Sequence, residues 1–207
     1  MKGHMLPREF YRQPTLELAQ ALLGKTLVHE TPSGSTAGMI VETEAYIGPG
    51  DRAAHSYQNR RTKRTEVMFD VPGKIYTYVM HTHCLLNVVS GQAEVPEAVL
   101  IRAVEPLAGV ELMEKRRGKG RPVRELTSGP GKLTKAMGIT REVYGGVFYE
   151  RPLYICTGRE IPTSEVAAGP RIGIHNTGEA REYPWRYWIR DNTFVSRPRH
   201  ESKKPVT

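Results

Sequence analysis

The strongest constraint on the fold comes from two β-rich runs that follow the turn-forming pair Pro72-Gly73. One run extends from Lys74 to Met80 and the other from Leu85 to Ser90, with His81-Thr82-His83-Cys84 between them. Branched and aromatic side chains are enriched in strands because they fit a pleated, half-buried surface. Two such runs on either side of a short polar segment are typical of a hairpin. The sequence therefore predicts a β-hairpin with a polar tip over residues 74–90.

A second hairpin is predicted earlier in the chain. Strand patterns cover Thr26 to His29 and Gly38 to Tyr46, and the turn Pro32-Ser33-Gly34-Ser35 lies between them. The second of these strands ends on the acidic and aromatic segment Val41-Glu42-Thr43-Glu44-Ala45-Tyr46. Further strands are expected at Ala98 to Val104, Leu153 to Cys156, Arg171 to Ile174 and Trp185 to Ile189.

Three helices are predicted between these strands. Apolar residues at helical spacing follow Thr15 and stop before Gly24, so we expect a helix over residues 15–23 with Thr15 as its N-cap. Helical spacing also covers Leu107 to Arg116. Pro130 opens a short helix that reaches about Met137, because proline is tolerated in a first helical turn.

The length of 207 residues and a hydrophobic fraction of 39% favour a single domain over residues 1–207 with one substantial core.

No apolar run approaches the roughly 18 residues that a membrane helix needs. Residues 1–13 lack the order of regions in a signal peptide, so we expect a cytoplasmic protein with Cys84 and Cys156 as free thiols. From about Ser196 to residue 207 the chain is rich in proline and charge, which predicts a flexible tail.

Basic residues exceed acidic ones by 30 to 22, which gives a formal charge of +8 and a pI near 9.6. Such a balance favours polyanionic partners, of which nucleic acid is the foremost. The excess is clustered at Arg60, Arg61, Lys63 and Arg64, at Lys115, Arg116, Arg117, Lys119, Arg121 and Arg124, and at Lys203 and Lys204. The alternative, that each cluster is merely a solvated loop, stays open on charge alone.

Glu42 and Glu44 are two positions apart on a predicted strand, so their side chains point to the same side, and Tyr46 continues that face. An aromatic ring beside a carboxylate suits a site that holds a flat ligand next to a general base. The alternative is a solvated edge strand with ordinary surface glutamates, and spacing alone favours that alternative.

His55, Tyr76 and Tyr78 are further candidates for a pocket, because the two tyrosines share one face of the predicted strand at 74–80. A nucleobase that has left the duplex is held by stacking on aromatic faces, and a positively charged alkylated purine gains a cation–π attraction. Half-buried strand tyrosines are common, so each residue alone carries little weight.

His81, His83 and Cys84 raise the possibility of a zinc site, but Leu85 and Leu86 beside them offer no further ligand. Contact with nucleic acid is the favoured role of this tip. A glycine-rich phosphate loop, a dinucleotide fingerprint and a serine elbow are all absent from the sequence. The sequence is therefore not that of a nucleoside-triphosphate or hydride-transfer enzyme.

Five segments in their order and spacing resemble the alkyladenine (3-methyladenine) DNA glycosylase family. They are Val41 to Tyr46, Ala53 to Ser56, Gly73 to Asn87, Leu100 to Pro106 and Ser128 to Leu133. The resemblance extends from about Leu16 to Val195. It implies a monomeric α+β domain without metal or cofactor, with a curved, mainly antiparallel sheet, flanking helices and a protruding β-hairpin that inserts into DNA.

The resemblance also implies roles for individual residues. Glu44 corresponds to the water-activating glutamate and Arg102 to an arginine near the water, whereas Glu42 matches a position without a catalytic role. The base is sandwiched by Tyr46, His55 and Tyr78 and screened by Asn87. Arg60, Arg64 and Lys132 are expected to contact DNA, together with the hairpin tip.

The hairpin tip departs from the family pattern. The family's best-known wedge is a tyrosine, whereas this chain has His81 at the aligned position and one residue fewer before Asn87. We expect His81, or its neighbours Thr82 and His83, to fill the stack that the damaged base vacates.

The function implied is hydrolytic removal of alkylated or deaminated purines from double-stranded DNA, which leaves an abasic site. The members of this class are 3-methyladenine, 7-methylguanine, hypoxanthine and ethenoadenine. Two alternatives stay open: a non-catalytic nucleic-acid-binding protein, and a small metal-dependent hydrolase built on His81, His83 and Cys84. A lyase reaction would need an amine nucleophile, and Lys132 is expected to be a charge contact instead.

Overall fold

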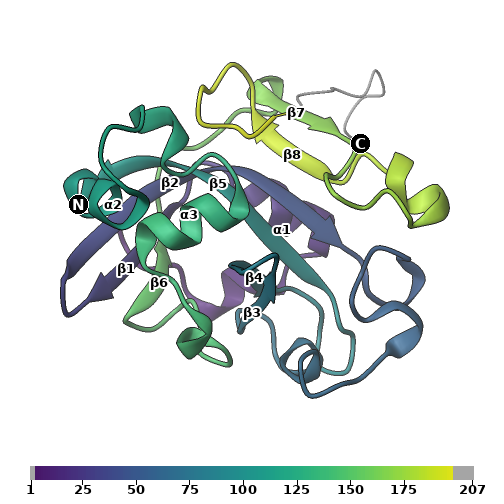
Figure 1. Ribbon diagram of the computed structural model, residues 1–207. Helices are drawn as coiled ribbons and strands as arrows, with labels where there is room; N and C mark the ends of the chain where they lie inside the picture. The colour runs from purple at the N-terminus through teal and green to yellow at the C-terminus, as the bar shows by residue number, and fades with distance from the viewer. Residues whose placement is uncertain (1–2, 198–207) are drawn as a thin grey trace.

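The computed structural model describes residues 3–197, which form an α+β fold (Figure 1). Every strand pairing in it is antiparallel, and the sheet order is β3-β4-β5-β2-β1-β6, with β8 on β2 and β7 on β8. The strands are β1 Thr26–Thr31, β2 Gly34–Tyr46, β3 Ile75–Met80, β4 His83–Val89, β5 Ala98–Ala108, β6 Leu153–Cys156, β7 Val166–Gly169 and β8 Arg186–Ile189. The helices are α1 Thr15–Ala21, α2 Val110–Arg117 and α3 Pro130–Met137. This fold confirms the class predicted from the sequence.

Strand β2 organises the sheet because it pairs with three other strands. Its first half pairs with β1, residues 37–46 pair with β5, and residues 42–44 also pair with β8. The register to β5 shifts on both sides of Glu42, which marks a β-bulge. Bulges bend a strand and re-aim its side chains. The acidic end of β2 is therefore enclosed between β5 and β8 instead of lying at an open sheet edge.

Helices α1 and α3 cover the sheet, with α3 in front of it and α1 behind it in the view of Figure 1. Leu18 and Leu22 at α1 and Leu133 and Met137 of α3 are all buried in the main hydrophobic core. Helix α3 comes close to the hairpin formed by β3 and β4: a Cβ atom at Gly131 would lie 2.7 Å from His83. Only glycine permits this approach, which places the start of α3 beside the hairpin tip.

The first helix differs from the prediction at both ends. Thr15 is its first residue and not its N-cap, and the Thr15 hydroxyl lies 2.8 Å from the Ser90 hydroxyl instead of capping a backbone amide. The helix ends at Ala21 rather than residue 23. The predicted hairpins and α3 are confirmed, as is the strand at 153–156.

The predicted strand Arg171 to Ile174 is wrong, because this segment is a bend that follows strand β7. A side chain takes the place of a strand partner there: the Ile172 amide donates to the Glu44 carboxylate.

At the other end of the chain, Ser196 is buried and bonded to Glu42, so the packed structure includes the residue at which we expected the tail to begin. Residues 198–207 of that predicted tail lie outside the described residues. Within the described part, no helix is long and apolar enough to cross a bilayer.

Candidate active site

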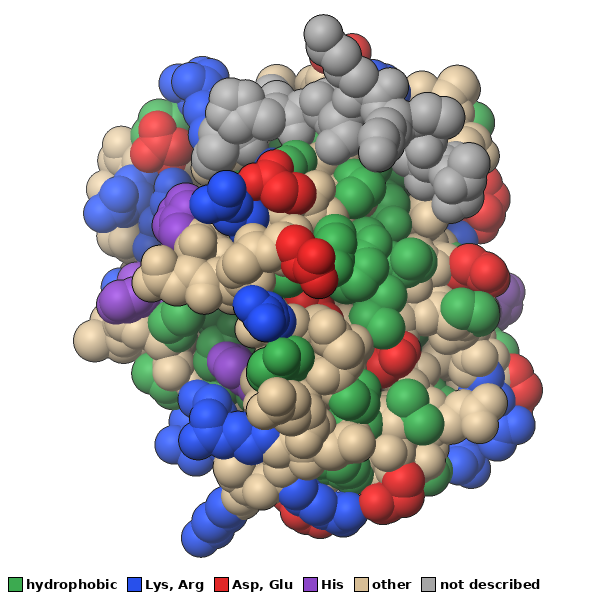
Figure 2. All heavy atoms as spheres, turned by 90° about the vertical axis from the view of Figure 1, so that its right-hand side faces the viewer, with side chains coloured by type: hydrophobic (Ala, Val, Ile, Leu, Met, Phe, Trp, Pro, Cys, Tyr) green, Lys and Arg blue, Asp and Glu red, His purple; other side chains and the backbone are tan. Residues whose placement is uncertain are grey.

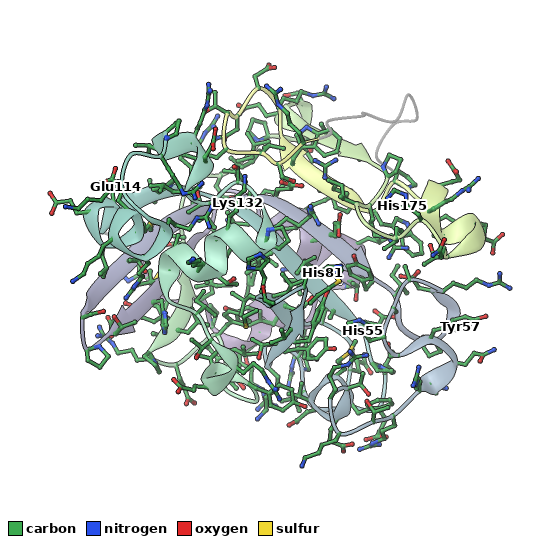
Figure 3. All side chains as sticks on the ribbon, in the orientation of Figure 1. His55, Tyr57, His81, Glu114, Lys132 and His175 are labelled. Atoms are coloured by element: carbon green, nitrogen blue, oxygen red, sulfur yellow. The ribbon has the colours of Figure 1, made fainter. Side chains whose placement is uncertain are left out.

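A pocket of about 310 Å³ lies between the hairpin, the sheet and residues 172–177. Aromatic and apolar side chains form most of its wall, joined by Asn87 and Arg102. Figure 3 labels His55 and His175, which both line the pocket and come from segments far apart in the chain. The residues around it include Tyr46, Ala53, Met68, Tyr76, Tyr78, Met80, Leu85, Leu100, Pro130, Ile172 and Ile174. A larger cavity of about 1000 Å³, lined by His29, Arg116 and Tyr149 among others, contains none of the predicted site residues.

Four aromatic side chains predicted from the sequence meet in this pocket. The rings of Tyr76 and Tyr78 are stacked with centroids 5.6 Å apart, and His55 meets Tyr78 edge-on at 4.5 Å. The Tyr76 hydroxyl and His55 Nδ1 are 2.7 Å apart, which fixes the imidazole ring. Tyr46 lines the same pocket from the end of β2. The arrangement offers several flat faces to a planar ligand.

His55 is set up as an uncharged ring. Burial, reinforced by the nearby charges of Arg64 and Arg60, lowers its pKa to about 4. At neutral pH the imidazole therefore carries no charge. A neutral ring can stack against a base without repelling a cationic one.

Glu44 is fully buried behind the pocket wall and makes three contacts. Oε2 accepts a hydrogen bond of 2.8 Å from the Tyr46 hydroxyl, and Oε1 accepts one of 2.7 Å from the Ile172 amide. Arg102 Nη1 lies 3.2 Å from Oε1. A carboxylate has about four lone-pair sites, so one site on Oε2 has no partner among the described residues.

Tyr46 is held as a hydrogen-bond donor. Burial and the adjacent Glu44 carboxylate raise the pKa of its hydroxyl well above the usual range. The phenol therefore stays protonated, and its proton points to Glu44. This bond fixes the rotation of the carboxylate with respect to the pocket.

Glu42 shares a face with Glu44, as predicted, but it is not a surface residue. Its side chain is fully buried, and its carboxylate accepts hydrogen bonds from Arg102, Arg186 and the Ser196 amide and hydroxyl. Burial alone would raise the Glu42 pKa, but Arg102, Arg186 and Ser196 together lower it. The solvated-edge alternative is wrong for both glutamates, because β5 and β8 enclose this part of β2.

Arg102 connects the two carboxylates. Its Nε donates to Glu42 over 2.8 Å, while Nη1 faces Glu44 and the side chain lines the pocket. Although burial opposes the charged form, Glu44 and Glu42 raise the pKa of Arg102 above its usual range. A permanently charged guanidinium is thus locked next to Glu44.

Asn87 lines the pocket from strand β4. It is buried, and its amide nitrogen donates to the Tyr76 carbonyl over 3.1 Å. This hydrogen bond holds the amide group in place on β4. The remaining hydrogen-bonding capacity of the amide is available to a ligand.

The hairpin tip is shorter than the sequence predicted. His81 and Thr82 form the two-residue turn, both with positive φ (47° and 69°), whereas His83 already belongs to β4. Two central residues with positive φ match the twist of a tight hairpin. Next to the turn, Val79 and Met80 are 49% and 45% exposed, and Met80 also lines the pocket. Val79 and Met80 were not predicted as site residues, although the sequence places them at the end of the predicted strand, directly before the polar tip.

The basic residues fall into three sets that differ in position and in ion pairing. Arg60, Arg64 and Lys132 are exposed, and Figure 2 shows Lys, Arg and His side chains concentrated along the left-hand side of one face. Arg61 is instead tied to Glu66 and Glu94. The basic residues of α2 lie on another side of the molecule, as the label of Glu114 shows in Figure 3.

Several residues of the site were not predicted. Ile172 supplies the amide that binds Glu44, and Arg171 and Asp51 form a buried ion pair behind Tyr46. Asp51 follows the turn Gly48-Pro49-Gly50, close to the acidic segment, but nothing in the sequence spacing links it to a residue 120 positions away. Among the described residues, His81, His83 and Cys84 are not part of any group of three potential metal ligands.

Comparison with known proteins identifies the class: the chain is a DNA glycosylase, an enzyme of DNA repair that acts on DNA. The family model "Methylpurine-DNA glycosylase (MPG)" matches residues 9–193, so the chain belongs to this family. Relatives named "Putative 3-methyladenine DNA glycosylase" include those of Bacillus licheniformis, 62% identical, and Bacillus subtilis, 60% identical. Both alignments cover 93% of this chain and 96% of the relative. The relative from Listeria monocytogenes serotype 4a is 46% identical over 92% of this chain and 91% of its own.

Proposed function

We propose that this protein hydrolyses the N-glycosidic bond of alkylated or deaminated purines in double-stranded DNA and leaves an abasic site. The substrates of this class are 3-methyladenine, 7-methylguanine, hypoxanthine and ethenoadenine. The observation that carries the proposal is the buried Glu44 carboxylate, which contacts Tyr46 and Arg102, two residues that line the aromatic pocket. The names of the relatives mention one member of this class, 3-methyladenine.

The pocket has the shape and chemistry for one extruded purine. A base that enters it stacks on the ring of Tyr46, with His55 and Tyr78 on the other wall, and Asn87 faces its edge. Electron-rich aromatic faces attract a purine that carries a positive charge after alkylation. In this proposal the Asn87 amide discriminates between bases by the hydrogen-bonding groups that they carry on that edge.

Glu44 performs the chemical step in this proposal. Departure of the purine leaves positive charge on the sugar, and an anion next to that charge stabilises it. The free site on Oε2 accepts a proton from water, which then attacks the sugar carbon as the bond to the base breaks. Arg102 and the Ile172 amide bind the other oxygen and keep the carboxylate from turning away.

The reaction is simple hydrolysis without a covalent intermediate. A lyase reaction requires an amine at the sugar. No lysine is among the described residues that line the pocket, and Lys132 is exposed on α3. Lys132, Arg60 and Arg64 are instead assigned to phosphate contacts around the pocket mouth.

The hairpin of β3 and β4 is the element that enters the minor groove in this proposal. Its tip residues, His81 and Thr82, are exposed and follow Met80, which contributes to the pocket. His81, with Thr82 and His83 next to it, fills the stack that the purine vacates. The protein acts as a monomer because one chain contains the pocket, the carboxylate and the hairpin.

The proposal is tested with a panel of duplexes that each carry one lesion. The wild-type protein is incubated with each duplex, and abasic sites are revealed by alkaline strand cleavage, with and without EDTA and with borohydride trapping. We expect base release that EDTA does not change and no trapped adduct. Binding to lesion DNA without release of any base would favour the non-catalytic alternative, and loss of release in EDTA would favour the metal-dependent one.

A further inference from the structure

A buried ion pair lies directly behind the pocket. The side chains of Arg171 and Asp51 are both inaccessible to solvent, and Arg171 Nη2 donates to Asp51 Oδ1 over 2.8 Å. Arg171 also donates to the Ala45 carbonyl over 2.8 Å. Isolated charges are strongly disfavoured in such a place, so each partner neutralises the other.

The guanidinium of Arg171 is stacked between two aromatic rings. Its central carbon lies 4.7 Å from the ring centre of Tyr46 and 5.0 Å from that of Trp185. Arg171 Nε has no hydrogen-bond partner among the described residues, in keeping with a group held by stacking. Tyr46 lines the pocket and Arg171 does not. Arg171 therefore covers the face of Tyr46 that is turned away from the base.

Arg171 also anchors a segment of the pocket wall. It immediately precedes Ile172, whose amide binds Glu44, and residues 172–177 line the pocket. Arg171 Nη2 donates to the Ala180 carbonyl over 3.2 Å, and Ala180 follows shortly after this segment. The segment is thus fixed on both sides by one side chain.

We propose that Arg171 and Asp51 are positioning residues of the base pocket, whose paired charges also keep the outer face of Tyr46 neutral, so that a cationic purine is admitted. This inference rests on the proposed function. Stacking at about 3.5 Å from Tyr46 places the base about 8 Å from the guanidinium. At this distance, with an effective dielectric constant of about 20, repulsion between a cationic base and an unpaired guanidinium would weaken binding of the base roughly 30-fold. Asp51 cancels this penalty.

Two variants unbalance the pair in opposite directions. Asp51→Asn leaves a net positive charge behind Tyr46, and Arg171→Met leaves a net negative charge. The measurement is kcat/KM for a duplex with cationic 7-methylguanine and for one with neutral hypoxanthine. We expect the ratio of the two values to fall about tenfold or more in Asp51→Asn and to rise in Arg171→Met. A purely structural role lowers both values together, leaves the ratio unchanged, and overturns the charge assignment.

Glu30→Gln is the matched control. Glu30 pairs with Arg151 through two hydrogen bonds, so its change also removes one carboxylate from an arginine, but the pair lies outside the pocket. We expect its ratio to stay within about twofold of wild type. Thermal unfolding is recorded for every variant, and assays are run below each midpoint.

The double variant Asp51→Asn with Arg171→Met contains no unpaired charge and is used if a single variant does not fold. We expect a ratio close to that of wild type, with both kcat/KM values about tenfold lower or more because Tyr46 and residues 172–177 lose their anchor. Unchanged kcat/KM values for both lesions would refute the positioning role. A wild-type protein that releases neither base would instead refute the proposed function, so the two failures are distinguishable.

Discussion

The hydroxyl of Tyr46 and the carboxylate of Glu44, two positions apart on β2, are joined by a hydrogen bond of 2.8 Å. Residues i and i+2 of a strand point to the same side, so this contact follows from the local geometry of β2. Tyr46 lines the pocket, whereas Glu44 is completely buried. The tyrosine thus links the surface that receives the base to the group assigned to activate water.

Replacement of Glu44 tests the assigned base directly. Glu44→Gln keeps the size of the side chain and removes its charge and basicity. We expect excision to fall by at least ~100-fold, the low end of general-base contributions, while lesion DNA is still bound. Single-turnover excision and gel-shift titration measure the two effects, and turnover at the wild-type rate would refute the assignment.

Glu42→Gln acts through stability as well as through the site. Removal of this charge takes from Arg102 and Arg186 the buried carboxylate that both of them contact, and loss of one member of a buried pair costs about 3–5 kcal/mol. We expect a lower free energy of unfolding in urea at pH 7 and slower excision, because Arg102 is no longer fixed. Glu42 is therefore unsuitable as an inert control for Glu44, and Glu30→Gln takes that place. Wild-type stability of Glu42→Gln would contradict the network.

The same network sets a pH dependence of stability. The pKa of Glu42 is lower in the folded protein than its usual value of 4.5, so the unfolded chain takes up the proton first as the pH falls. Its stabilising contribution is complete above about pH 4.5 and is lost as the pH falls through the folded pKa. We expect the free energy of unfolding of wild type to decrease more steeply below pH 4.5 than that of Glu42→Gln. Parallel pH profiles of the two proteins would speak against this contribution.

His55 is expected to remain neutral under all ordinary assay conditions. Burial, with Arg64 and Arg60 nearby, lowers its pKa to about 4. The unfolded chain binds this proton first, so the contribution of His55 to stability is present above about pH 6.5 and is lost toward pH 4. Titration of the ring carbon resonance by NMR should give a midpoint near 4. A midpoint near 6.5 would show that the ring is exposed and outside the pocket wall.

The hairpin tip is predicted to matter for duplex DNA alone. A wedge compensates the stacking that is lost when a base leaves the helix, and a single strand has no partner stack to refill. We expect His81→Gly and Thr82→Gly each to slow excision from a duplex by about tenfold and to leave excision from a single strand within about twofold. Equal losses on both substrates would assign these residues to the pocket itself.

The aromatic part of the site was predictable because it depends on strand periodicity. Tyr76 and Tyr78 share a face of β3, and Glu42, Glu44 and Tyr46 share a face of β2, as the alternation of strand side chains requires. The hairpins were likewise predicted from turn residues and β-rich runs. Periodicity did not indicate burial, however, because β8 covers β2 from a distant part of the chain.

The parts that escaped prediction are all long-range. The Arg171 segment follows a strand pattern in sequence, yet its arginine pairs with Asp51 and its next amide binds Glu44, 128 positions earlier. These side-chain bonds take the place of the backbone hydrogen bonds between strands that the sequence pattern predicted for this segment. Thr15 shows the same effect at a helix start, where a hydroxyl of the right type for capping is engaged by Ser90 instead.

The bond between Glu42 and Ser196 spans 154 positions and has a consequence for synthesis of the protein. A growing chain exposes Glu42 long before Ser196 has been made, and the carboxylate then lacks the backbone donor that completes its shell. Because Glu42 in turn holds Arg102 beside Glu44, the shell around the assigned site is completed only after the segment that contains Ser196 has left the ribosome. A nascent or clipped chain that lacks Ser196 therefore lacks two of the donors that fix Glu42 behind the assigned site.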